Sequence, residues 1–305
     1  MLVRDLQVDI TTYCNSHCGG CIRNKDGGEV CVELVHLSPE IFQKINFDDI
    51  RIVYFNGAYG DFTMHPDVLR IIDSIPSHVT FDASTNGGAR GKAWWSQLTN
   101  ILKKFKDGRI TFAIDGIDTN HMYRRGVNID RVLENAQSFI QAGGNARWKY
   151  IAFEHNQHEI EKASNLAKDM GFTEFIVGES YSPEIYQKRY STFNEMTVKH
   201  VVAPTKYNWR NDRSRIYRYL EEVDLGFRCT WRNEGRAQLD SWGNIWQCCY
   251  MPSIATHPEM FKELNLFELD NNLHKYSYDE ILQGSFFTEL FDEPIELCKN
   301  CKDYV

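Results

Sequence analysis

Nine cysteines are the residues of this 305-residue sequence whose type and spacing point most directly to chemistry. They form two groups, with no cysteine between them: Cys14, Cys18, Cys21 and Cys31, then Cys229, Cys248, Cys249, Cys298 and Cys301. An odd number of cysteines in tight groups, on a chain without an export signal, indicates metal binding before disulfides. Thiolates are soft ligands, so the pattern favours an iron–sulfur cluster or zinc.

The first group has the spacing C-x3-C-x2-C, from Cys14 through Cys18 to Cys21. Three thiolates on one short loop can bind three irons of a cubane cluster, whereas a closed [4Fe–4S] site has four ligands. The missing ligand leaves one iron open to a substrate or cofactor, as in catalytic metal sites. Two alternatives remain: a zinc site completed by His17 or Cys31, and thiols without a metal. Zinc loops more often pair two C-x2-C turns, which weakens the zinc alternative.

The elements that position this loop follow from apolar periodicity over the first ~180 residues. Strands are expected at Gln7–Thr11, Ile50–Asn56, His78–Ser84, Arg109–Asp115, Trp148–Phe153 and Glu174–Val177. Helices are expected from Ser38-Pro39 and over Pro66–Ile75, Lys92–Lys104, Asp130–Ala142 and Gln157–Met170. Alternating strands and helices predict an α/β fold with a parallel sheet and right-handed crossovers. Parallel sheets place ligands at the carboxyl ends of their strands, where this loop lies.

With the strand order in place, the stretch TTYCNSHCGGC resembles the signature of the radical S-adenosylmethionine superfamily. The resemblance covers residues 1–180 and implies a partial (β/α)6 TIM-like barrel with the cluster loop after the first strand. It implies that Cys14, Cys18 and Cys21 hold a [4Fe–4S] cluster, whose open iron is chelated by the amino and carboxylate groups of S-adenosylmethionine. One electron then splits this cofactor into methionine and a 5′-deoxyadenosyl radical, which abstracts hydrogen from a substrate. Gly20 departs from the family, which commonly has an aromatic residue before the third cysteine.

The same resemblance assigns cofactor contacts to the ends of later strands. FNGAYGDFTMHP takes the place of the family's Gly-Glu-Pro motif, so Gly60 and Asp61 are expected at the cofactor's amino group. Asp61 is one methylene shorter than Glu, Phe62 replaces the proline, and a turn-forming role is the alternative for Asp61. By the same resemblance, further cofactor contacts are expected from Ser84, Asn86 and Asp115.

Three polar residues near these strand ends have less specific interpretations. Arg125 has the chemistry to pair with a carboxylate in a bidentate manner or to lie solvated at the surface. His155 and Asn156 follow the fifth strand, and we expect Asn156 to cap the next helix.

The second cysteine group has a C-x13-G-x4-C opening and a final C-x2-C. Between the first two cysteines, RAQLDSWGNIWQC predicts a β-hairpin, and a last helix is expected around Tyr278–Phe291. The group resembles the auxiliary-cluster modules of some radical S-adenosylmethionine enzymes, in the short twitch form rather than the longer SPASM form. The resemblance implies a second [4Fe–4S] cluster on Cys229, Cys248, Cys298 and Cys301; zinc is the alternative. The expected domains are therefore 1–180 for the barrel, 181–228 for a capping connector and 229–305 for the auxiliary module.

Cys249 directly follows the expected ligand Cys248. Neighbouring residues on a strand point to opposite faces, so we expect only one of the two to bind the cluster. The spacing favours Cys248. Cys249 is then a structural thiol, an alternative ligand, or a thiol that donates a hydrogen atom to a substrate radical.

The reaction and its partners are less specified than the cofactors. Dehydrogenation, epimerisation and peptide modification all fit, on a small-molecule or peptide substrate, with a flavodoxin- or ferredoxin-type electron donor. Since 13 residues precede Cys14, a leader-binding part is expected on a separate chain. A non-catalytic electron carrier and a zinc-stabilised binding module are the competing classes. The net charge of −8 argues against general nucleic-acid binding, and the absence of a long apolar run predicts a cytoplasmic protein without a membrane span.

Overall fold

The computed structural model describes residues 2–19, 21, 23–24, 29–179, 230–249, 251–252 and 269–288. The chain divides into two units, one formed by residues 1–8, 37–54 and 208–305 and the other by residues 9–36 and 55–207. The strands of both units are mostly parallel, which confirms the α/β class expected from the sequence.

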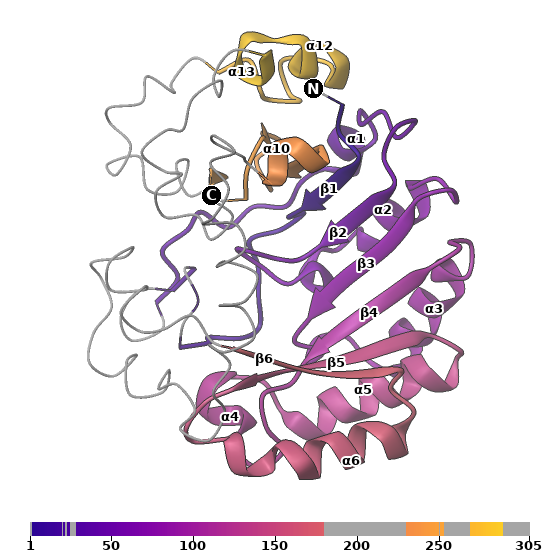
Figure 1. Cartoon of the computed structure of the whole chain (residues 1–305), viewed down its shortest axis with the longest axis vertical. Coiled ribbons are helices and arrows are strands. Elements are labelled where there is room, and N and C mark those ends of the chain that lie inside the picture. Colours follow the sequence, from indigo (N-terminus) through magenta and orange to yellow (C-terminus); the bar gives the residue numbers. More distant parts are fainter. Residues whose placement is uncertain are drawn as a thin grey trace, which may run out of the picture. The chain divides into compact units, whose positions relative to one another are not determined.

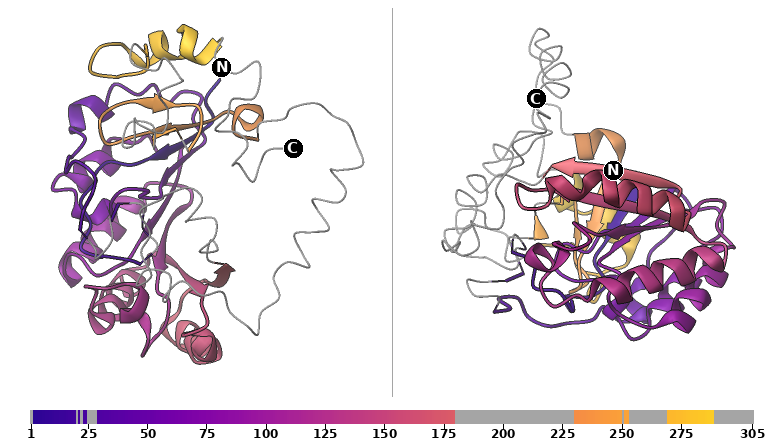
Figure 2. Two further views of the ribbon diagram at one scale, coloured as in Figure 1. Left: turned by 90° about the vertical axis from the view of Figure 1, so that its left-hand side faces the viewer. Right: turned by 90° about the horizontal axis from the view of Figure 1, so that it is seen from below.

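The second unit contains four parallel strands and the helices that follow them. The strands are β3 (Thr80–Thr85), β4 (Gly108–Ala113), β5 (Asn145–Ala152) and β6 (Glu174–Glu179). The helices are α2 (Val68–Ser74), α3 (Lys92–Leu102), α4 (Asn120–Tyr123), α5 (Ile129–Gln141) and α6 (Ile160–Met170), with 3-10 turns η2 (Phe62–Met64) and η3 (Gln157–Glu159). Figures 1 and 2 show α3, α5 and α6 along one face of these strands.

The two faces of β3–β6 differ in chemistry because side chains alternate along a strand. On the face toward the helices, Phe112 of β4 packs against Trp95 of α3 and Phe139 of α5, with ring centroids 5.1 and 6.0 Å apart. On the other face, Arg147 of β5 donates hydrogen bonds of 2.7 Å to both carboxylate oxygens of Asp82 on β3. The helix face is therefore an apolar core, and the opposite face is polar and charged.

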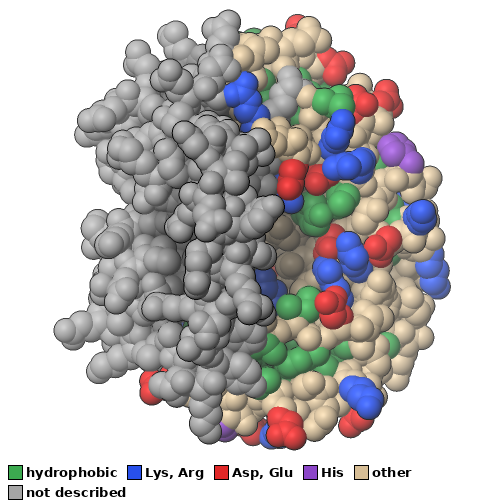
Figure 3. All heavy atoms as spheres, in the orientation of Figure 1, with side chains coloured by type: hydrophobic (Ala, Val, Ile, Leu, Met, Phe, Trp, Pro, Cys, Tyr) green, Lys and Arg blue, Asp and Glu red, His purple; other side chains and the backbone are tan. Residues whose placement is uncertain are grey.

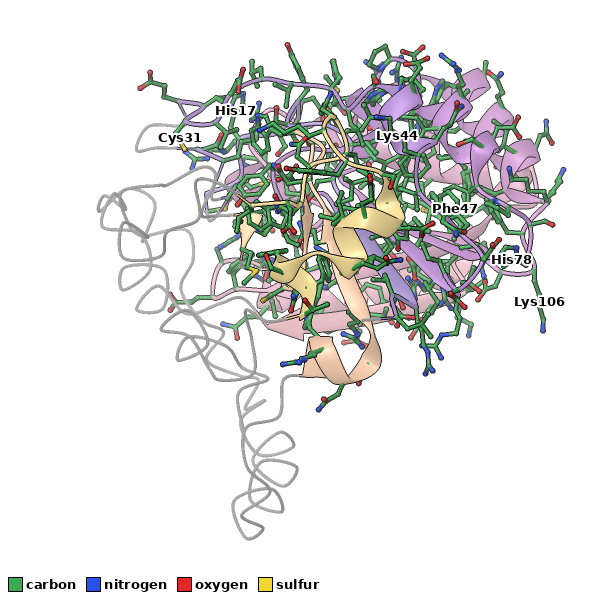
Figure 4. The ribbon with its side chains drawn as sticks, turned by 90° about the horizontal axis from the view of Figure 1, so that it is seen from above. His17, Cys31, Lys44, Phe47, His78 and Lys106 are labelled. Carbon is green, nitrogen blue, oxygen red and sulfur yellow. The ribbon has the colours of Figure 1, made fainter. Side chains whose placement is uncertain are left out.

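The first unit contains the remaining strands. Strand β1 (Asp5–Val8) pairs in parallel with β2 (Ile52–Phe55) and with β7 (Arg236–Leu239), and β8 (Ile245–Trp246) is antiparallel to β7. Its helices are α1 (Pro39–Phe42), α10 (Thr230–Glu234), α12 (Tyr278–Gln283) and α13 (Ser285–Thr288). Lys44, labelled in Figure 4, donates from its Nζ to the Leu273 carbonyl at 2.7 Å and so ties the chain after α1 to the segment before α12.

The hairpin in the C-terminal part is confirmed, because β7 and β8 pair around Trp242-Gly243-Asn244. The buried Asp240 carboxylate accepts from the backbone N–H groups of Trp242 and Asn244, each at 2.9 Å, and so closes the turn. The sequence did not indicate that β7 extends the parallel sheet next to β1.

The expectation of one helix over Tyr278–Phe291 is wrong. Helix α12 ends at Gln283, and a second short helix, α13, begins after Gly284. Gly284 has an extended backbone, and a Cβ there would lie 2.1 Å from a carboxylate oxygen of Asp270. The same Asp270 accepts a hydrogen bond from the Ser285 N–H, so the break has a local cause.

Two further observations bear on membranes and on the charge of the surface. Within the described part of the chain, no helix is both long and apolar enough to cross a membrane. On the face shown in Figure 3, acidic and basic side chains of the described residues are interspersed.

Candidate functional site

The loop after β1 lies against the loop after β2, with backbone on backbone. The Asp61 N–H donates to the Tyr13 carbonyl at 2.8 Å, and the Ala58 N–H donates to the Asp9 carboxylate at 2.6 Å. Gly60 allows this approach, because a Cβ on it would lie 2.1 Å from the Thr11 carbonyl oxygen. The expected cofactor residue Gly60 therefore positions the cysteine loop (residues 14–21) through its lack of a side chain.

The returning segment 29–36 holds the start of the cysteine loop from the other side. The Thr12 hydroxyl donates to the Glu33 carbonyl at 2.8 Å and accepts from the Val35 N–H at 2.7 Å. Arg23 donates from Nε to the Thr12 carbonyl at 2.7 Å. Figure 4 labels the two alternative fourth ligands, His17 on the cysteine loop and Cys31 on the returning segment.

Polar groups lie close to the cysteine sulfurs. Cys14 Sγ accepts from the Ser16 N–H at 3.4 Å and from Asn86 Nδ2 at 3.5 Å. Cys18 Sγ lies 3.1 Å from the Ser16 hydroxyl and 3.9 Å from Nη1 of Arg124. Hydrogen bonds of this kind stabilise thiolates and tune the potential of iron–sulfur clusters.

The thiols themselves need a cationic partner to ionise. Burial raises the pKa of Cys14 to about 12, and the nearby Asp61 carboxylate adds to the rise. Burial also raises the pKa of Cys21 to about 12, with the charge of Cys18 adding to it. In the described part of the chain, no three His, Cys, Asp or Glu side chains already converge as a metal site. The donor set nonetheless fits an iron–sulfur cluster, whose irons supply the positive charge that the buried thiolates require.

Asp61 is buried, and both oxygens of its carboxylate accept hydrogen bonds from protein groups. Its carboxylate caps the 3-10 turn η2, accepting from the N–H of Thr63 at 3.1 Å and from its hydroxyl at 2.6 Å. It also accepts from the Thr85 hydroxyl at 2.9 Å and from the Asn86 N–H at 2.8 Å. These bonds match the turn-forming alternative, and they join the loop after β2 to the end of β3.

The motif at the end of β3 divides its residues between two roles. Thr85, which belongs to the same strand face as Ala83, binds Asp61, whereas Ser84 lies on the opposite, polar face. Asn86 faces the cysteine loop, donating from Nδ2 to Asn15 Oδ1 at 2.8 Å in addition to its contact with Cys14. The structure therefore brings Asn86 to Cys14.

Asp115, after β4, forms a buried ion pair that the sequence did not reveal. Its Oδ2 accepts from Nε of Arg124 at 2.7 Å, and its Oδ1 accepts from the Ile151 N–H at 2.7 Å. Asn156 donates from Nδ2 to the Asp115 carbonyl at 2.7 Å. The expectation that the Asn156 side chain caps a helix is wrong, because it makes no capping bond to η3 and instead joins the ends of β4 and β5.

Arg124 is the site residue that sequence reasoning missed. The sequence has two adjacent arginines after the fourth strand, Arg124 and Arg125, and no local feature separates them. Arg125 contributes its backbone carbonyl, which accepts from the His17 N–H at 2.8 Å, and no described residue accepts a hydrogen bond from its buried Nε. The structure instead turns Arg124 toward Cys18.

Of the second cysteine group, only Cys248 and Cys249 lie among the described residues, and both are half-buried. Strand β8 ends at Trp246, so the two cysteines lie in the turn that follows it. The argument that they point to opposite faces of a strand is therefore wrong. Cys229, Cys298 and Cys301, like Gly20 of the first group, lie outside the described residues.

Known structures share this fold. The chain has the fold of the radical S-adenosylmethionine enzymes, which confirms the expected partial TIM-like barrel. It is similar to Streptococcus suis SuiB bound to S-adenosylmethionine, with a TM-score of 0.61 and 15% identity over 99% of this chain and 71% of that one. It is also similar to anSMEcpe with bound AdoMet, with a TM-score of 0.57 and 15% identity over 98% of this chain and 86% of that one. No family model matches the chain.

Similarity also extends to structures that contain peptides. SuiB bound to its precursor peptide SuiA matches with a TM-score of 0.63 and 16% identity, over 99% of this chain and 70% of that one. At these identities the likeness concerns the fold.

Proposed function

We propose that this chain is a radical S-adenosylmethionine enzyme that modifies a peptide or protein substrate. The observation that carries the proposal is the cysteine loop. Its Cys14 sulfur accepts hydrogen bonds from Ser16 and Asn86 and its Cys18 sulfur accepts one from Arg124, within a fold that binds S-adenosylmethionine in similar proteins. Cys14, Cys18 and Cys21 would hold a [4Fe–4S] cluster. When bound and reduced, this cluster supplies the electron that cleaves S-adenosylmethionine, so that the 5′-deoxyadenosyl radical can abstract hydrogen from the substrate.

The chain's own residues would orient and shield that chemistry. Asn86 links the end of β3 to Cys14, and Gly60 lets the loop after β2 approach the cysteine loop. Asp61, Ser84 and Asp115 remain our proposed neighbours of the cofactor, although the Asp61 carboxylate already accepts protein hydrogen bonds. A cofactor amino group would have to share its oxygens with Thr85 and Asn86.

The substrate class rests on the peptide complexes of the similar proteins. SuiB binds the peptide SuiA, and anSMEcpe binds the Kp18Cys peptide, with a TM-score of 0.56 to this chain. We therefore favour a peptide over a small molecule. Dehydrogenation, epimerisation, with Cys249 as a hydrogen donor, and cross-linking remain the reaction types. A flavodoxin- or ferredoxin-type protein would supply electrons in the cytoplasm.

The proposed second cluster would lie on Cys229, Cys248, Cys298 and Cys301. Its support is the cysteine spacing and the hairpin that leads to Cys248. In a dehydrogenation it would receive the electron of the substrate radical.

The test is anaerobic reconstitution with iron and sulfide, followed by dithionite and S-adenosylmethionine, with 5′-deoxyadenosine measured by chromatography. The wild-type protein should be brown and form 5′-deoxyadenosine, and Cys18→Ala should form none. Cys31→Ala is the matched control and should retain product formation. A brown protein that forms no 5′-deoxyadenosine would instead be an electron carrier, and a colourless zinc-containing protein would be a binding module.

A further inference from the structure

A buried positive charge lies beside the cysteine loop. Arg124 Nε and Asp115 Oδ2 are 2.7 Å apart, and their side chains are 13% and 0% exposed. Nη1 of the same guanidinium is 3.9 Å from Cys18 Sγ. One end of the Arg124 fork therefore holds a carboxylate and the other faces a proposed cluster ligand.

The surroundings hold this ion pair in place. The Asp115 N–H donates to Asn120 Oδ1 at 2.9 Å, and the second Asp115 oxygen is occupied by the Ile151 N–H. Cys18 and Ile151 also pack against the buried pair of rings formed by Tyr123 and Phe153. Because both side chains of the pair are largely buried, their charges act more strongly on their neighbours than surface charges do.

The ionisation of the two groups agrees with this geometry. Burial opposes the charge on Arg124, but Asp115 and then Cys18 outweigh it, so the pKa of Arg124 is raised. The guanidinium thus stays charged at neutral pH. Burial raises the pKa of Asp115, and Arg124 opposes that rise.

We propose that Arg124, oriented by Asp115, sets the reduction potential of the cluster that Cys18 would hold. This inference rests on the proposed function. Reduction adds one electron, taken from an external reductant, to the cluster and its thiolates. A nearby fixed cation stabilises the more negative, reduced form and raises the potential, whereas a nearby carboxylate lowers it. Arg124 acts through Cys18 and is therefore a positioning residue.

The two members of the pair make predictions of opposite sign. Arg124→Gln removes the cation and should shift the potential to more negative values. Asp115→Asn removes the countercharge but keeps an acceptor oxygen, and should shift the potential to less negative values. Loosening of the pocket, by contrast, would move both variants in the same direction.

The experiment is a redox titration of the reconstituted full-length protein without S-adenosylmethionine. Electron paramagnetic resonance detects the reduced cluster and so gives its reduction potential. Arg124→Lys should stay near the wild type, because it keeps the charge. Arg131→Gln is the matched control; this exposed arginine binds the Arg90 carbonyl and should leave the potential unchanged. Unshifted potentials, or shifts of the same sign in Arg124→Gln and Asp115→Asn, overturn the inference.

The failure of this inference differs from the failure of the proposed function. A wild-type protein that takes up no cluster or forms no 5′-deoxyadenosine contradicts the proposed function. A wild-type protein that does both, with potentials insensitive to the pair, contradicts only the role of Arg124. If Arg124→Gln takes up no iron, the Asp115→Asn variant alone tests the inference: a shift of its potential to less negative values supports the role of Arg124, and any other result contradicts it.

Discussion

At the scale of single residues, Asp61 shows how one side chain serves a loop and a neighbouring strand. The resemblance to the family motif predicts a cofactor contact, whereas the structure shows a carboxylate that accepts from Thr63, Thr85 and Asn86. A buried carboxylate with several donors is costly to replace, because each donor would be left without its acceptor.

Replacing Asp61 should therefore destabilise the protein before any cofactor is added. Asp61→Ala should lower the free energy of unfolding by roughly 3 kcal/mol, in the upper part of the range for single substitutions. Asp73→Ala is the control; its carboxylate is 70% exposed and pairs with Lys104, so its loss should cost less than about 0.5 kcal/mol. Urea denaturation of the metal-free proteins measures both. Equal stability of the two variants would contradict the bonding role of Asp61.

The raised pKa values of Cys14 and Cys21 predict how the metal-free protein reacts. The thiolate is the reactive form, and a pKa of about 12 leaves little of it at pH 8. Both thiols should therefore be alkylated slowly by iodoacetamide at pH 8, with rates rising about tenfold per pH unit up to pH ~11. Mass spectrometry of peptides from the folded and urea-unfolded protein measures the difference. Equal rates in the two states at pH 8 would show that folding does not suppress these thiolates.

At the scale of elements, the site depends on three loops that follow β1, β2 and β3 and touch one another. The loop after β2 approaches the cysteine loop at Gly60, and the end of β3 reaches it through Asn86. No single loop holds the cysteines in place, since each loop is fixed by backbone or buried polar contacts to the next.

Gly60→Ala tests this arrangement at the level of the backbone. The added Cβ would meet the carbonyl oxygens of Thr11 and Tyr13 at 2.1 and 2.8 Å, so the cysteine loop would have to move. We expect a loss of roughly 2 kcal/mol or more in stability and impaired iron uptake. Gly91→Ala is the control, because a Cβ there meets nothing within 4 Å and its backbone is extended. Thermal melts and iron content separate the two; an unchanged Gly60→Ala protein would refute the contact.

At the scale of the whole molecule, the proposal requires two clusters with separable roles. Each [4Fe–4S] cluster contains four irons, so the reconstituted protein should bind about eight irons per chain. Cys298→Ala should lose about half of the iron, because one thiolate ligand of the second cluster is removed. It should still form 5′-deoxyadenosine, because the cysteine loop is unchanged.

Iron and sulfide analysis, with chromatography for 5′-deoxyadenosine, measures this prediction. Cys31→Ala again serves as the cysteine control and should retain all of the iron. If the Cys298→Ala protein retains eight irons, Cys298 is not a cluster ligand. If the wild-type protein binds zinc, the second metal site is a zinc site and not an iron–sulfur cluster.

Several parts of this protein could be predicted from the order of residues along short stretches of the chain. Cysteine spacing predicted the loop, apolar periodicity located the strands β1 to β6, and Trp242-Gly243-Asn244 located the hairpin. The ends of the strands differ from the predicted ends by a few residues. Strand β1, for example, ends at Val8, and the next residue, Asp9, accepts a hydrogen bond from the Ala58 N–H in the loop after β2. These features could be predicted because each depends only on residues close to one another in the sequence.

The polar contacts of the site, by contrast, depend on the packing of the folded chain. It paired Asp61 with Thr85, directed Arg124 rather than Arg125 toward Cys18, and placed β7 beside β1. These contacts join residues far apart in the chain, and neighbouring residues of the same type, such as two arginines, carry no local mark of which one turns inward. The physical reason is that burial, and with it the strength of each charge and hydrogen bond, exists only once the strands and loops have packed together.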